Sequence, residues 1–80
     1  MFKAGDLVVF VRPHPAEAGL VHKVAKAMVD RWGMHWVLLV SEPADVPAGS
    51  GPVEVEPGVF GGLGCWEEAK EFKLAEANNA

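Results

Sequence analysis

The imidazole and thiol side chains that could ligate a metal ion in this chain are few and widely separated. Three histidines and one cysteine supply the nitrogen and sulfur ligands, at His14, His22, His35 and Cys65. Zinc sites bring such residues within about two to five positions of one another, as in Cys-x-x-Cys, and no pair here has that spacing. We therefore expect no metal ion and no cofactor.

Nucleophilic catalysis would need a hydroxyl or a thiol beside a general base. The only hydroxyl side chains belong to Ser41 and Ser50, and neither lies in a Gly-x-Ser-x-Gly turn of the kind that exposes a catalytic serine. Cys65 could pair with a histidine across the fold, but a single cysteine next to a tryptophan is typical of a small packing residue. No catalytic residue is predicted. An enzyme site completed only at a junction between subunits is the alternative.

A glycine cluster and two pairs of glutamates could in principle bind phosphate or act as acid and base. Residues 58–64 hold four glycines but lack the Gly-Lys-Ser/Thr ending of a phosphate-binding loop, so they predict turns. Glu54 and Glu56 share one face of a predicted strand, and Glu67 and Glu68 lie in a predicted helical turn. An acid–base pair needs a concave and partly dry site, so we expect both pairs to form solvated acidic surface.

Aromatic and basic residues near the middle of the chain offer the strongest candidate binding site. Trp32 and Trp36 flank a predicted hairpin turn at residues 30–33, in which Gly33 takes the left-handed position. Trp36 or Trp66 is expected to anchor the core, whereas Trp32 is the candidate for an exposed aromatic at a partner or subunit interface. The predicted binding residues are Trp32, His35, Lys23, Lys26 and Arg31.

Length and net charge limit the classes of protein to which this chain can belong. The 80 residues suit one domain, which we place at residues 1–77, with 78–80 as a frayed tail. The net charge of −4 divides into +2 for residues 1–40 and −6 for residues 41–80, and such a chain is not expected to bind duplex DNA sequence-specifically. The longest apolar stretch, residues 32–40, is about half of a bilayer span, so we expect no membrane contact and a cytoplasmic location.

Strand patterns dominate the chain. Residues 5–12, 35–41 and 53–56 predict strands, from β-branched runs or from alternation of apolar and polar residues. Residues 16–32 fit two patterns, a helix by apolar spacings of three and four, and a hairpin strand by alternation over 20–29. Between residues 43 and 64, 10 of 22 residues are Pro or Gly, which predicts loop. A short helical turn is expected near residues 65–71, continuing as helix or leading into a last strand.

The order of these features resembles the five-stranded SH3-like barrels found in many small phage and mobile-element proteins. The likeness rests on Phe2-Lys3-x-Gly5-Asp6-Leu7-Val8-Val9, on residues 19–24 and 36–40, and on Trp66-x-x-Ala69-x-x-Phe72-Lys73-Leu74. It implies a mainly β fold, a five-stranded SH3-like barrel in which the helical turn near 65–71 leads into the last strand. The alternative is an α+β fold, a βαβ arrangement with a helix over 16–32. No tyrosine is present, so the tyrosine-rich groove of SH3 modules that bind proline-rich peptides is not carried over.

These expectations favour a small non-enzymatic interaction module that binds a protein partner or itself. Scarce charge over residues 32–40 and the modest core available to 80 residues favour a dimer or higher oligomer. The alternative is a barrel that binds a small ligand or single-stranded nucleic acid. It would use Trp32 and His35 for stacking and the basic patch of Lys23, Lys26 and Arg31 for charge.

Overall fold

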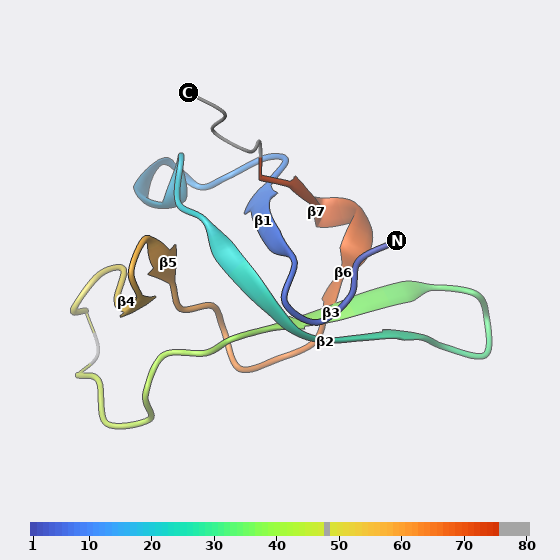
Figure 1. Ribbon diagram of the computed structural model, residues 1–80. Helices are drawn as coiled ribbons and strands as arrows, with labels where there is room; N and C mark the ends of the chain where they lie inside the picture. Colours follow the sequence, from blue (N-terminus) through green and yellow to red (C-terminus); the bar gives the residue numbers. More distant parts are fainter. Residues whose placement is uncertain (48, 76–80) are drawn as a thin grey trace.

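The computed structural model describes residues 1–47 and 49–75, and this part of the chain is almost entirely β-structure (Figure 1). A five-stranded sheet has the order β6-β3-β2-β1-β7, and β4 and β5 form a separate two-stranded sheet. The strands are β1 (Leu7–Phe10), β2 (His22–Val29), β3 (His35–Leu39), β4 (Glu54–Glu56), β5 (Val59–Phe60), β6 (Glu67–Glu68) and β7 (Phe72–Leu74). Two 3-10 turns are η1 (Pro15–Glu17) and η2 (Ala69–Glu71). The expected tail at 78–80 lies outside the described residues.

The ambiguous stretch at residues 16–32 is mostly strand, so the βαβ alternative is wrong. Gly19 has a φ of 81°, which a right-handed helix does not accommodate. β2 pairs antiparallel with β1 at His22 and Lys23 and with β3 from Val24 to Val29, so its backbone hydrogen bonds are those of a strand. Of the apolar residues that matched helical spacing, Met28 and Val29 are exposed, whereas Val24 is buried in the core. Their pattern therefore did not reflect burial on one helix face.

The C-terminal elements complete the sheet at both edges. β6 pairs with β3, η2 follows directly, and β7 then pairs antiparallel with β1 through Val8↔Leu74 and Phe10↔Phe72. The helical turn expected near 65–71 is confined to the three residues of η2, and Glu67–Glu68 is strand. Within the described ranges no pairing joins β6 to β7, so the sheet is open and the expected closed barrel is not found.

The glycine cluster makes a turn and also a close backbone contact. Gly58 has a φ of 77° in the tight connection between β4 and β5, as expected for a turn residue. Gly61 and Gly62 instead lie against the chain that follows β3, where the Gly62 N–H donates to the Val40 carbonyl at 2.9 Å. A Cβ on Gly62 would come within 2.7 Å of the Leu39 side chain. The absence of a side chain is what allows this approach.

The core is small and built from aliphatic residues with one phenylalanine. It consists of Val8, Val24, Val37, Leu39 and Phe72, with Phe2, Phe10 and Ala69 partly buried against it. Neither Trp36 nor Trp66 anchors it, contrary to expectation. Trp36 precedes the buried Val37 on β3, so strand alternation directs its side chain to the opposite face, and Trp66 is 40% exposed. In the described part of the chain no helix is long and apolar enough to cross a membrane.

Candidate functional site

We call the far half of the β2–β3 hairpin, residues 26–38, the arm, and its turn projects beyond the rest of the chain (Figure 1). At its base, Val37 is buried and paired with Glu67 of β6. Its end is a tight turn in which the Gly33 N–H donates to the Asp30 carbonyl at 3.0 Å, and Gly33 has a φ of 82°. The Asp30 N–H donates to the Met34 carbonyl at 2.9 Å, which closes the ladder. This is the hairpin turn that the sequence predicts, with glycine in the left-handed position.

The Asp30 carboxylate organises the turn through three hydrogen bonds. Oδ1 accepts from the backbone N–H groups of Trp32 at 2.9 Å and Met34 at 3.0 Å, and Oδ2 accepts from Trp36 Nε1 at 2.9 Å. The bond from Trp36 is the main reason that the pKa of Asp30 lies below its ordinary value. The two backbone bonds and the nearby His35 lower the pKa further, whereas burial opposes the shift. Asp30 thus links the turn to the side chain of Trp36.

Apolar side chains are exposed around this turn. Trp32 is 74% exposed, and the Arg31 guanidinium carbon lies 4.4 Å from the centre of its ring. Met28, Val29 and Met34 are each between 38% and 47% exposed. Single exposed apolar residues are ordinary, but a tryptophan with three apolar neighbours at one end of a hairpin is typical of an interaction surface.

The structure divides the five predicted binding residues into two groups. Lys26, Arg31, Trp32 and His35 all lie on the arm and are exposed. Lys23 does not join them, because it lies at the start of β2 and its Nζ is 3.0 Å from Glu56 Oε1. Of the predicted basic residues, Lys23 is therefore engaged with Glu56, whereas Lys26 and Arg31 belong to the arm.

The outer edge of the arm is an unpaired strand edge. β1 pairs with β2 only at Lys23 and His22, and the last bonds on that side are those of Val24 with Gly5 and Asp6. Because Asp30 is hydrogen-bonded to Met34, alternation directs the backbone groups of Met28 towards β3 and those of Ala27 and Val29 outward. In residues 1–47 and 49–75, no backbone partner pairs with Ala27 or Val29 on this outer side.

Sequence reasoning found Trp32 but missed Met28, Val29, Met34 and the free edge at Ala27. A signal was present in the alternation of residues 20–29, which marks a strand. Once the strand is paired to 35–39 in a hairpin, a short β1 cannot reach its far half, since β1 has four residues and β2 has eight.

Replacing Gly33 with alanine is expected to lower the free energy of unfolding by about 1 kcal/mol. A Cβ at this position would meet no atom within 4 Å, so the whole cost comes from the φ of 82°. Gly33→Asn should cost about half as much, because asparagine tolerates this conformation better. Urea denaturation of the three proteins measures both values. Equal stabilities for all three would contradict the observed turn.

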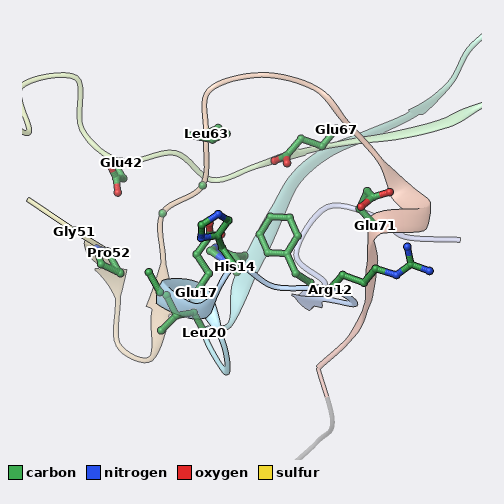
Figure 2. Close-up of a pocket in the computed structure, with 15 residues that line it drawn as sticks. Arg12, His14, Glu17, Leu20, Glu42, Gly51, Pro52, Leu63, Glu67 and Glu71 are labelled. Atoms are coloured by element: carbon green, nitrogen blue, oxygen red, sulfur yellow. The ribbon is translucent and has the colours of Figure 1, made fainter. Parts of the chain in front are cut away.

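A cleft of about 470 Å³ lies away from the arm, between η1 and the start of β2 on one side and the β6–η2 segment on the other (Figure 2). Glu67 lines it and is half-buried, which corrects the expectation that Glu67 and Glu68 form solvated surface. Burial raises the pKa of the Glu67 carboxyl, and the negative charges of Glu17 and Glu71 add to the shift. The expected acidic surface is found instead at Glu54, which is exposed and accepts from the Gly58 N–H at 2.8 Å.

The remaining candidates are the side chains that could ligate a metal ion and the single cysteine. Across the two described ranges, no group of three or more His, Cys, Asp or Glu side chains is placed to hold a metal ion. Cys65 is exposed.

Fold and surface together define a small all-β domain with a projecting hairpin that carries an exposed tryptophan in its turn. No family model, curated protein or solved structure matches this chain.

Proposed function

We propose that this domain is a non-enzymatic interaction module that self-associates through its arm. In this arrangement the outer edges of two β2 strands pair antiparallel about a two-fold axis, so that two sheets become continuous. The observation that carries the proposal is the unpaired edge at Ala27 and Val29, beside exposed Met28 and Trp32. An unprotected strand edge is a template for pairing with a further strand.

The residues along this edge are complementary to themselves. Only Ala27 and Val29 direct backbone groups outward, so the paired residues are Ala27 with Val29 of the second copy and the reverse. This register centres the axis at Met28 and places Lys26 opposite Asp30 of the second copy, once on each side of the axis. Opposite charges at directly opposed positions stabilise an antiparallel pair by about 0.2–1 kcal/mol. A two-fold contact repeats this gain.

The fold supports an SH3-like arrangement for the module. Five antiparallel strands with a short 3-10 turn leading into the last one are what the resemblance implies. The open sheet is a departure from that resemblance. Fold alone carries no function, so the argument for self-association rests on the arm.

The test is the concentration dependence of mass by analytical ultracentrifugation. The native chain should form a dimer, and Lys26→Glu should raise its Kd about tenfold, because two attractive charge pairs become repulsive. Ala27→Pro removes an outward N–H without touching the bond ladder to β3, and should also weaken the dimer. Lys73→Glu on the edge strand β7 is the matched control, because it makes the same change of charge away from the arm, and it should leave the Kd unchanged.

Other outcomes separate the alternatives. A strict monomer at all concentrations overturns self-association. If Lys73→Glu weakens the dimer and Lys26→Glu leaves its Kd unchanged, the interface lies at β7, and association through the arm is wrong. Saturable binding of a single-stranded oligonucleotide, measured by the quenching of tryptophan fluorescence, would favour the nucleic-acid alternative. That alternative has less support, because Lys23 is paired with Glu56 and Arg31 lies over the Trp32 ring.

A further inference from the structure

The cleft beside η1 combines apolar side chains with an excess of carboxylates. Phe10 and Leu20 line it together with Glu17, Glu67 and Glu71. Figure 2 shows Glu67 and Glu71 on one side of the cleft and Glu17 with Leu20 on another. Glu42 adds a fourth carboxylate, whereas Arg12, His14 and His22 are the basic residues of the lining. The cleft is therefore net negative, with room for a small organic molecule.

His22 lines this cleft and is buried, with only 2% of its surface exposed. Its Nδ1 lies 2.8 Å from the Phe60 carbonyl oxygen, which can only accept a hydrogen bond, so Nδ1 carries a proton. In the tautomer with the proton on Nδ1, the other ring nitrogen, Nε2, is the acceptor. In the described chain Nε2 is buried and has no hydrogen-bond partner. Phe10 fixes the ring from the side, edge to face, with the ring centres 5.4 Å apart.

Glu67 leaves a second buried acceptor in the same cleft. Its Oε2 atom is buried and finds no hydrogen-bond partner among the described residues. Burial is the largest cause of the raised pKa of this carboxyl, followed by the charge of Glu17, an opposing effect of His22, and the charge of Glu71. A buried acceptor without a donor costs about 1–3 kcal/mol, so both atoms favour a donor that enters the cleft.

We propose that the cleft binds an organic cation, an alkyl ammonium or alkyl guanidinium group, with its N–H groups donating to His22 Nε2 and Glu67. The alkyl part packs on Phe10 and Leu20, and Glu17 and Glu71 neutralise the charge. An anion is disfavoured because four glutamates line the cleft, against one arginine and two histidines. A bound metal ion is disfavoured because no group of three His, Cys, Asp or Glu ligands is placed for one in the described ranges.

The test is a titration of the full chain with n-butylguanidinium and n-butylamine, read from the imidazole signals of His22 by NMR. A Kd of about 1 mM is expected for ligands of this size. Glu67→Gln should weaken binding at least tenfold. Glu54→Gln is the matched control, because it removes the same charge outside the cleft and keeps an oxygen for the Gly58 N–H. It should leave the Kd unchanged.

A second readout separates a binding role of Glu67 from a structural one. The raised pKa of Glu67 means that its charged form destabilises the folded state above that pKa. Glu67→Gln should therefore unfold at the same or a higher temperature than the native chain at neutral pH while losing the ligand.

Two results would overturn the proposal. They are binding of n-butanol as tight as that of the cations, and a Kd for n-butylguanidinium that Glu67→Gln leaves unchanged. Comparing n-butylguanidinium with a blocked Gly-Arg-Gly tripeptide then distinguishes a free amine or guanidine from a peptide side chain as the source of the cation.

Discussion

Truncating Leu39 to alanine is expected to lower the free energy of unfolding by about 3 kcal/mol, the largest effect of any single change considered for this chain. Leu39 is 1% exposed at the end of β3 and packs with Val8, Val24, Val37 and Phe72. Its side chain also meets the backbone of Gly62, which approaches so closely that a Cβ there would overlap it. The truncation leaves a cavity between the sheet and the glycine segment, and neither side can collapse freely.

Urea denaturation followed by tryptophan fluorescence measures this loss. A domain of 80 residues has about 4–12 kcal/mol of stability in total, so the variant should unfold at a much lower urea concentration. Leu63→Ala is the control, since Leu63 is 68% exposed, and it should change stability by less than about 0.5 kcal/mol. A loss below about 1 kcal/mol for Leu39→Ala would show that the small aliphatic core is not the source of stability.

Replacing Asp30 with alanine is expected to disorder the end of the arm and abolish self-association. The change removes the acceptor of all three bonds from Trp32, Met34 and Trp36. It also removes the charge that faces Lys26 of the second copy in the proposed dimer. The NMR signal of the Trp36 indole N–H should move to the position of a solvated indole, and the mass by ultracentrifugation should fall to that of a monomer.

Asp30→Asn separates the two oxygens of the carboxylate. An asparagine keeps one acceptor for the N–H groups of Trp32 and Met34, whereas its NH₂ group faces the Trp36 N–H and cannot accept from it. The turn should therefore persist while the indole signal of Trp36 moves. An unchanged indole signal in both variants would contradict the bond between Trp36 and Asp30.

The same bond predicts a pH dependence of defined sign. The folded pKa of Asp30 lies below the ordinary aspartate value of about 3.9, first because of the bond from Trp36 and then because of the Met34 and Trp32 N–H groups and His35, against an opposing effect of burial. The stabilisation is therefore complete above that ordinary value and is lost as the pH falls through the folded pKa. The Trp36 indole signal should stay constant at higher pH and move only in this acidic range, with no such movement in Asp30→Asn.

The sequence predicts the strands of this fold better than their closure. Leu7–Phe10, His35–Leu39 and Glu54–Glu56 are strands where β-branched runs or alternation predicted them. The sequence does not decide between helix and strand over 16–32, because the apolar residues there suit both the helical and the strand period. The strand forms because β2 pairs with β1 and β3, and such pairing is not a local property of the sequence. Closure of five strands into a barrel depends on the twist of the sheet and the register of the strands, which are not local properties of the sequence either.

The candidate sites show the same limit. Trp32 could be predicted because a tryptophan beside a tight turn has little chain around it to cover it. The free edge of β2 could not, since it exists only because β1 is shorter than β2. The cleft could not be predicted either, because His22 and Glu67 are far apart in sequence, and the sheet order β6-β3-β2 brings their strands near each other. The sequence around Glu67 predicts a surface residue, since the burial of Glu67 comes from segments distant in the chain.

The pairing of β1 with β7 has a consequence for the order of folding. Phe10 on β1 lies opposite Phe72 on β7, and both residues pack in or against the core. Most of the chain separates these two residues in sequence. Closing so long a loop has an entropic cost that local contacts do not offset, and β-rich chains with such distant pairings fold in milliseconds to seconds. The β2–β3 hairpin, with its short turn, can form alone within microseconds. During synthesis the arm is therefore assembled and exposed well before the last strand arrives to seal the core.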